Sequence, residues 1–321
     1  LQVLESDGAS FPFSRGILAR SLMGLGLGPE LGYGLALQLE SDFLHRGLEV
    51  IDHDALHAEV RELLLEEAGE AYARRYDLMR SLRRRDKPLV VLVGGAPGVG
   101  KSSLAAELAY RLGLRRVVSS DAVREALRSL IGPELSPSLH RSSYTDWRSD
   151  LLPEEQASAK PKRKRVTRGF QSQAQQLATA LQAIVERSVA EATSLVLEGI
   201  HLVPGLLEFA PQTEAVIVEL VLVVEDEARH RRHFASRDEE TRQRRGQDAY
   251  LEHFEEIRII HDFIRERARQ EGVAVIETGD LEDAVSRAIE RVLDAQLSER
   301  EDGAPEPLDP SASAPDAPDE V

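Results

Sequence analysis

The residues best suited to chemistry stand together at positions 95–102, in the order G-x-x-x-x-G-K-S. Glycines let backbone N–H groups approach an anion closely, because no Cβ stands in the way. The lysine of this pattern can reach the β- and γ-phosphates of a nucleotide, and the serine can join a Mg²⁺ shell. We therefore expect a phosphate-binding loop for ATP and Mg²⁺. The predicted contacts are Gly95, Ala96, Pro97, Gly98, Val99, Gly100, Lys101, Ser102 and Ser103.

The segments on either side of this loop are those that a phosphate-binding loop requires. Residues 89–93 form an apolar, β-branched run, which predicts a strand buried on both faces. Residues 103–112 follow a helical pattern that ends at Gly113. A glycine-rich turn that merely joins a strand to a helix is the alternative, and the strand–loop–helix context favours nucleotide binding.

Two carboxylates stand at the ends of further predicted strands. Asp121 follows a short strand over 116–119, and we expect it to cap the next helix, to orient or deprotonate an acceptor hydroxyl, or to do both. Glu198 ends a strand over 194–198, and is either a Mg²⁺-supporting group or an exposed strand-end charge. For His201, just beyond, we expect a structural hydrogen bond.

An arginine-rich segment follows a fourth apolar strand at 215–224. In P-loop kinases the corresponding segment is a lid whose arginines neutralise charge as the phosphoryl group moves. Solvated surface charge is the alternative for any one of them. The predicted catalytic groups are Lys101, Asp121, Arg231, Arg232 and Arg237.

A polar and aromatic stretch at 139–147, LHRSSYTDW, holds groups that can recognise a small phosphorylated acid. A surface connection with one buried aromatic is the alternative. Together with the helix that starts near position 121, this stretch supplies the predicted substrate-binding residues. They are Asp121, Arg124, His140, Arg141 and Tyr144, while Ser102 and Glu198 are the predicted metal ligands.

The whole chain divides into three predicted parts. Residues 83–297 alternate strand and helix patterns, which is typical of an α/β fold with a mainly parallel sheet and flanking helices. Residues 1–82 form a small, mostly helical unit, and residues 298–321 form a disordered acidic tail. Within the α/β part, we interpret the basic run at 160–168 as a mobile, solvated loop.

Composition excludes several classes of function. The chain of 321 residues has no cysteine, which rules out disulfides and thiol chemistry and fits the cytoplasm. It has no signal-peptide pattern and no apolar run near the roughly 20 residues of a membrane span, so no membrane partner is expected. A net charge of −16 argues against nucleic-acid binding. A homo-oligomer is left open.

The first unit resembles the ATP-cone, a small regulatory nucleotide-binding domain of ribonucleotide reductases and some kinases. The resemblance rests on DGASFPFSRGILARSLMGLGL, HRGLEVID and YARRYDLMRSL. The family's usual Lys-Arg pair corresponds to Glu5 and Ser6, and a further family lysine corresponds to Ile17. We therefore expect the fold without its usual ATP binding, as a structural or oligomerising module.

Over residues 12–297 the sequence resembles the 2-phosphoglycerate kinase family. The matching stretches include GGAPGVGKSSLA, RRVVSSDAVREALR, LHRSSYTDW, VLEGIHLVPG and HRRHF…YLEHFEEIR. The resemblance implies ATP-dependent phosphorylation of 2-phosphoglycerate to 2,3-bisphosphoglycerate. The residues themselves support ATP-dependent phosphoryl transfer and leave two alternatives open. One is another acceptor (an inositol phosphate, a sugar phosphate or a polynucleotide end), and the other is a non-catalytic nucleotide-dependent switch.

Overall fold

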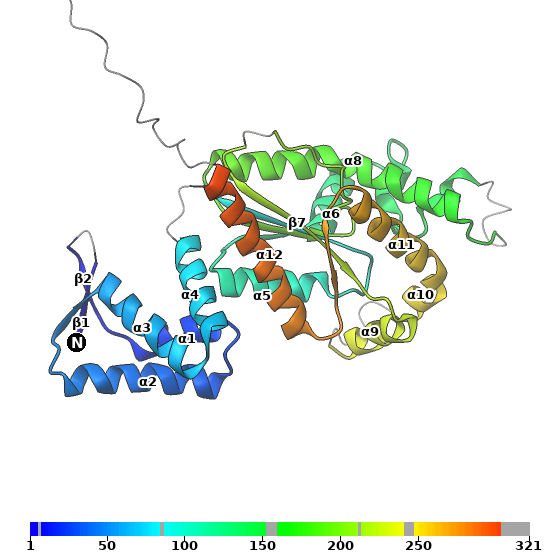
Figure 1. Ribbon diagram of the computed structural model, residues 1–321. Coiled ribbons are helices and arrows are strands. Elements are labelled where there is room, and N and C mark those ends of the chain that lie inside the picture. The colour runs from blue at the N-terminus through cyan, green and yellow to red at the C-terminus, as the bar shows by residue number, and fades with distance from the viewer. Residues whose placement is uncertain (6–7, 84–86, 152–158, 211–212, 241–246, 303–321) are drawn as a thin grey trace, which may run out of the picture.

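The computed structural model describes residues 1–5, 8–83, 87–151, 159–210, 213–240 and 247–302. It forms two units, which lie side by side in Figure 1. A small N-terminal unit precedes a larger one that is built around a five-stranded sheet. Within the described residues, no helix combines the length and apolar character that crossing a bilayer requires.

The N-terminal unit is mostly helical, as the sequence predicts. Asp52 caps one of its helices, because its carboxylate accepts from the backbone N–H groups of Asp54 and Ala55. The small sheet has the order β2-β1-β3. Its elements are β1 (Gln2–Leu4), β2 (Ser10–Pro12), α1 (Arg15–Met23), α2 (Pro29–His45), β3 (Val50–Asp52), α3 (His53–Glu67) and α4 (Glu70–Arg83). Ser6 lies outside the described residues, and the ATP-cone assignment stays a prediction.

The larger unit is a parallel sheet with the order β5-β6-β4-β7-β8. This confirms the predicted α/β fold. The carboxyl ends of all five strands therefore meet at one edge, where ligands of such sheets bind. The strands are β4 (Leu89–Gly94), β5 (Val117–Ser119), β6 (Leu195–Gly199), β7 (Val216–Val223) and β8 (Ala274–Glu277).

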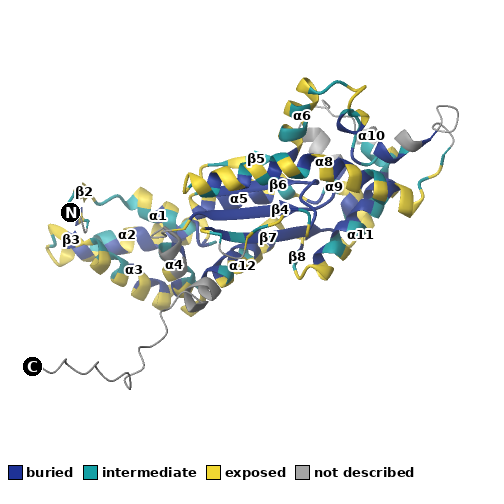
Figure 2. Cartoon of the chain, turned by 90° about the horizontal axis from the view of Figure 1, so that it is seen from above, coloured by how far each residue is buried: buried dark blue, intermediate teal, exposed yellow. Residues whose placement is uncertain are grey.

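Helices cover both faces of this sheet. α5 (Lys101–Leu112) and α12 (Leu281–Asp302) cover one face, and α8 (Arg163–Ala190) and α11 (Phe254–Gln270) cover the other. The central strand β4 is buried at every position, as Figure 2 shows. Val91 belongs to the α5/α12 side and Leu92 to the α8 side, so successive side chains enter opposite cores. This explains why β4 reads as a continuous apolar run.

Shorter elements surround the carboxyl edge of the sheet. Residues 250–269, predicted as one helix, belong to α10 and α11 and are interrupted at His253. α12 extends to Asp302, past the predicted boundary at residue 297, and residues 303–321 lie outside the described part. The remaining elements are α6 (Ser120–Leu130), η1 (Pro137–His140), η2 (Asp146–Asp150), α9 (Glu227–Glu240) and α10 (Gln247–Glu252).

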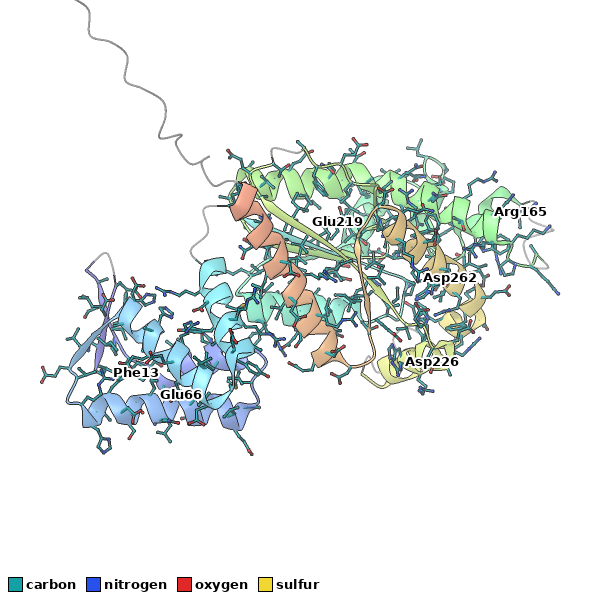
Figure 3. The ribbon with its side chains drawn as sticks, viewed as in Figure 1. Phe13, Glu66, Arg165, Glu219, Asp226 and Asp262 are labelled. Carbon is teal, nitrogen blue, oxygen red and sulfur yellow. The ribbon has the colours of Figure 1, made fainter. Side chains whose placement is uncertain are left out.

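The basic run at 160–168 differs from its prediction. The prediction of a mobile loop is wrong from Arg163 onward, because α8 begins there. Val166 and Phe170 lie one turn apart on α8 and are buried in one cluster with Trp147, which fixes these first turns. Arg165 lies at the end of α8 farthest from the N-terminal unit (Figure 3).

The two units share a continuous apolar core and an ionic contact. Arg111, on α5, is nearly buried and donates to both carboxylate oxygens of Glu282 on α12, at 2.7 and 2.5 Å. Arg75 of α4 donates to Glu290 of α12 at 2.9 Å. The helix that starts at the glycine-rich loop therefore ends where the N-terminal unit packs.

Candidate active site

The loop after β4 follows a path that needs glycine. Gly98 and Gly100 have φ angles of 79° and 88°, a region that L-residues with a Cβ rarely adopt. Gly98 also lies against the ring of Phe234, because a Cβ there would fall 2.6 Å from the ring. α5 begins at Lys101 without a side-chain cap, so its first N–H groups and the positive end of its dipole face the loop.

Four consecutive carbonyl groups of the loop accept hydrogen bonds from side chains. Their donors come from the loop itself, from α9 and from the residue after β8. They are Lys101 Nζ to Ala96 at 2.8 Å, His230 Nε2 to Pro97 at 2.8 Å, His233 Nδ1 to Gly98 at 2.9 Å, and Thr278 Oγ1 to Val99 at 2.9 Å. Among the described residues, the N–H groups of Gly98, Val99 and Gly100 have no protein acceptor. Side chains thus occupy the loop carbonyls, and the three amides remain available to bind an anion.

A cavity of about 520 Å³ opens in front of the loop. Its size lies within the usual range for a small-molecule site. It brings the phosphate loop together with both strand-end carboxylates and part of the 139–147 stretch. The lining residues are Pro97, Lys101, Ser102, Ser119, Asp121, Ala122, Arg124, Glu125, Ser142, Ser143, Tyr144, Glu198, Ile200 and Tyr250.

Asp121 faces this cavity from the first turn of α6. The helix is capped by Ser119, whose hydroxyl accepts from the N–H of Asp121 at 3.3 Å, so the interpretation of Asp121 as the N-cap is wrong. Its side chain is 52% exposed, and its nearest described charge is the Arg124 guanidinium at 3.6 Å. The carboxylate is therefore available to a molecule in the cavity.

Arg124 presents a fixed positive charge beside Asp121. Its NH1 donates to the backbone carbonyl of Arg141 at 2.7 Å, and its side chain is only 16% exposed. Its Nε is buried without a hydrogen-bond partner in the described structure. The side chain lines the cavity, where its fixed charge can pair with a ligand anion.

Glu198 occupies the tip of β6, in register with Val93 of β4 and Ser119 of β5. It is 7% exposed, which contradicts the interpretation as an exposed strand-end charge. No hydrogen bond or ion pair engages its carboxylate within the described residues. Together with the Ser102 hydroxyl it offers hard oxygen donors, which suit Mg²⁺. No group of three or more acidic, His or Cys side chains gathers as a metal site in the described structure.

His201 lies under the acceptor side of the cavity and makes the structural hydrogen bonds that we expected. Its Nδ1 accepts from Ser120 Oγ at 2.9 Å, and its Nε2 donates to Gln173 Oε1 at 3.2 Å. Burial lowers the pKa of His201 to about 4, so the ring is neutral near pH 7. Gly199 makes room for this contact, because a Cβ there would collide with Ser120 Oγ.

An aromatic wall closes the cavity on the side of α10. Tyr144 lies with its ring centroid 5.8 Å from Tyr250 and 5.3 Å from His253. Burial raises the pKa of Tyr144. Sequence reasoning missed Tyr250, because it reads as the ordinary start of a helix and no local pattern marks it.

Several predicted site residues lie elsewhere. His140 uses its Nε2 on the backbone carbonyl of Ile131 at 2.8 Å, and neither His140 nor Arg141 lines the cavity with its side chain. Arg231 lies 3.7 Å above the Phe254 ring and does not line it either, nor does the exposed Arg232. The side chain of Arg237 lies outside the described residues.

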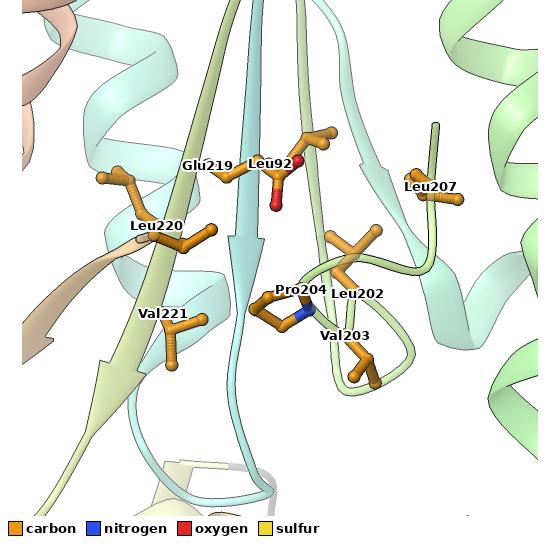
Figure 4. A pocket seen from close by; sticks show the side chains of 10 residues that line it. Leu92, Leu202, Val203, Pro204, Leu207, Glu219, Leu220 and Val221 are labelled. Atoms are coloured by element: carbon orange, nitrogen blue, oxygen red, sulfur yellow. The ribbon is translucent and has the colours of Figure 1, made fainter. Parts of the chain in front are cut away.

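A second cavity between β4, β7 and residues 202–207 is too small to compete as the site. Figure 4 shows its apolar walls, with the Glu219 carboxylate among them. Its volume of about 10 Å³ holds at most one water molecule. Burial raises the pKa of Glu219, which is the ordinary effect of an apolar surrounding on a carboxyl group.

Comparisons with known proteins show which families this chain resembles. The model of the AAA ATPase domain family matches residues 72–232. The 2-phosphoglycerate kinase of Methanopyrus kandleri is 36% identical over 286 residues, which are 89% of this chain and 85% of the relative. The 2-phosphoglycerate kinase of Pyrococcus horikoshii is 34% identical, over 91% of this chain and 94% of the relative. A gluconokinase structure from Sinorhizobium meliloti is 17% identical, with a TM-score of 0.36, and the match covers 67% of this chain and 97% of that structure's chain.

Proposed function

The chain belongs to the 2-phosphoglycerate kinase family and to the AAA ATPase domain family over residues 72–232, and from that premise we propose that it phosphorylates 2-phosphoglycerate. The γ-phosphoryl group of ATP passes to the 3-hydroxyl, which gives 2,3-bisphosphoglycerate and ADP. The observation that carries this proposal is one continuous cavity that joins a phosphate loop to a carboxylate and a buried guanidinium.

The loop binds the triphosphate of ATP. The N–H groups of Gly98, Val99 and Gly100 and the N-terminus of α5 supply donors that need no rearrangement. Lys101 Nζ exchanges its bond to the Ala96 carbonyl for the β- and γ-phosphates. Ser102 and Glu198 would hold a Mg²⁺ ion, which when bound supplies charge neutralisation at these phosphates.

The acceptor lies on the Asp121 side of the cavity. Arg124 pairs with its phosphate or carboxylate through the guanidinium, and Tyr144 packs beside it. Asp121 orients the 3-hydroxyl and takes its proton as the oxygen bonds to the γ-phosphorus. The bond from that phosphorus to the β–γ bridging oxygen breaks, and its electron pair leaves with ADP.

Positive charge for the transferring group comes from the arginines of α9. Arg231, Arg232 and Arg237 are the predicted sources. His140 and Arg141 remain predicted contacts of the acceptor. Of these side chains, none that the structure describes lines the cavity. The charge-neutralising role and the acceptor contacts would therefore need rearrangements that accompany substrate binding.

The test is an ADP-release assay with purified protein, ATP and Mg²⁺ across chemically related acceptors. We expect turnover with 2-phosphoglycerate and much less with 3-phosphoglycerate, inositol phosphates, sugar phosphates or 5′-hydroxyl oligonucleotides. Mass spectrometry of the product must show a bisphosphorylated glycerate. Lys101→Ala, prepared in parallel, controls for a contaminating kinase.

Turnover with a different acceptor alone would overturn the choice of substrate and keep the reaction class. ATP binding without turnover on any acceptor would instead favour the nucleotide-dependent switch. Steeply salt-dependent binding of an oligonucleotide would point to the polynucleotide end.

A further inference from the structure

One face of α9 is packed directly on the phosphate loop. His230, His233 and Phe234 stand at i, i+3 and i+4 and so share this face. Asp226 begins the helix, because its carboxylate accepts from the N–H of Ala228 at 2.7 Å (labelled in Figure 3). Nothing in the proposed reaction uses the two histidines, although both lie within hydrogen-bond distance of the loop.

Each histidine donates to a loop carbonyl, and their surroundings fix which nitrogen carries the proton. His230 must donate from Nε2 to the Pro97 carbonyl, which leaves its Nδ1 as an acceptor toward Arg258 NH1 at 3.4 Å. Arg258 is itself held by the Val224 carbonyl at 2.6 Å. Burial lowers the pKa of His230 to about 4, so this neutral form persists near pH 7. His233 donates in the same way from Nδ1 to the Gly98 carbonyl.

The position of a carbonyl determines the direction of the next amide. The peptide group is planar, and in its trans form the C=O and the N–H of one plane point in opposite directions. No cis peptide bond occurs in the described chain. A side chain that holds the Pro97 carbonyl therefore aims the N–H of Gly98 the other way, and holding the Gly98 carbonyl aims the N–H of Val99.

The same reasoning extends to the third amide. Thr278 holds the Val99 carbonyl and so aims the N–H of Gly100. These three N–H groups are the ones without a protein acceptor in the described structure. Phe234 presses on Gly98 and stacks on Tyr250, at 5.0 Å between centroids and 13° between planes, which keeps α9 against the loop.

We propose that His230 and His233 are positioning residues that aim the N–H groups of Gly98 and Val99 at the phosphates and thereby set the affinity for ATP. They touch neither the nucleotide nor the acceptor. The inference rests on nucleotide binding by the loop and is independent of the acceptor's identity.

The test compares variants that remove the donor with variants that restore it. His230→Phe and His233→Phe leave a carbonyl unpaired, and we expect each to raise the Kd for ATP about tenfold or more. His230→Gln places an amide nitrogen where Nε2 stood, and His233→Asn does so for Nδ1. Both should return the Kd to within about threefold of the parent protein.

Titration calorimetry with ATP gives the Kd directly, and kinetics should show a rise in KM for ATP with little change in KM for the acceptor. His45→Phe, on α2 of the N-terminal unit, is the matched control. If His230→Phe does not fold, His233→Phe and the near-isosteric Thr278→Val carry the test, with the same expected rise. Thermal unfolding of each variant separates folding from binding.

Three outcomes are decisive. Folded phenylalanine variants that bind ATP as tightly as the parent, while Lys101→Ala does not, would overturn the positioning role and leave the kinase proposal intact. Failure of the parent protein itself to bind ATP would instead overturn the proposed function. A defect that Gln and Asn do not repair would assign the histidines to packing and also contradict the inference.

Discussion

The two sides of the cavity are organised by different means. On the proposed nucleotide side, the groups available for binding are backbone amides, while side chains from α9 and from the residue after β8 donate to the loop carbonyls. On the proposed acceptor side, the candidate binding groups are themselves side chains, and Asp121 is 52% exposed beside Arg124. The path of the backbone thus sets the binding groups on the nucleotide side, while the identity of individual side chains sets them on the acceptor side.

This difference has a physical reason. A triphosphate presents a dense, constant pattern of oxygens, which preorganised amides and a helix N-terminus match without reorganisation. An acceptor must be distinguished from its isomers by the position of a few charges, which long side chains such as Arg124 provide. Changes on the nucleotide side should therefore damage ATP binding, and changes on the acceptor side should damage turnover.

The largest effect is expected from Lys101→Ala, which removes the cation that serves both phosphates. We expect kcat to fall by about 10³- to 10⁵-fold, the range typical of a charge on the transferring phosphoryl group. ADP release at saturating acceptor measures it, and Lys164→Ala on α8 is the control. A loss of less than tenfold would place the cationic centre elsewhere.

Asp121→Asn tests the acceptor side of the cavity. Loss of the carboxylate should lower kcat by about 10²- to 10⁴-fold, because the acceptor proton loses its base. The Kd for ATP, measured by calorimetry, should stay unchanged. Glu125→Gln, at the same cavity and one turn along α6, should be nearly neutral. A raised Kd for ATP in Asp121→Asn would contradict the division between the two sides.

The support under the acceptor side should make stability depend on pH. In the folded chain the pKa of His201 is about 4, below its usual 6.5. Between pH 6.5 and pH 4, His201 is therefore protonated in the unfolded chain and neutral in the folded chain. Its contribution to the free energy of unfolding should fall by about 3 kcal/mol between pH 6.5 and 4. Urea unfolding at several pH values measures this. His201→Gln should flatten the dependence, and an unchanged slope would argue against a neutral, buried ring.

The smallest effect is expected far from the cavity. Arg111→Ala removes the bidentate contact to Glu282 between α5 and α12, and should lower the free energy of unfolding by about 1–2 kcal/mol. Turnover should be retained, because neither side of the cavity changes. Urea unfolding and ADP release together check this, with Arg111→Lys as the charge-preserving control. A large loss of kcat would indicate coupling along α5 to the loop.

Much of the site was predictable from the sequence because it is encoded by local spacing. The pattern at 95–102, the buried strand before it and the helix after it all lie within one short stretch. Glu198 was predictable because parallel strands bring their carboxyl ends to one edge. These features depend on neighbours along the chain, which the sequence shows directly.

Only the tertiary structure decided what surrounds these groups. His230 meets the Pro97 carbonyl across 133 positions of sequence, and no local pattern marks such a pair. Tyr250 lines the cavity, while His140 donates to the carbonyl of Ile131. Local sequence does not mark either contact, because each depends on tertiary packing. The start of α8 at Arg163 depended on burial of its first turns against Trp147, which belongs to another element. The sequence thus determined which groups form the proposed phosphate loop, and long-range packing determined which way they point.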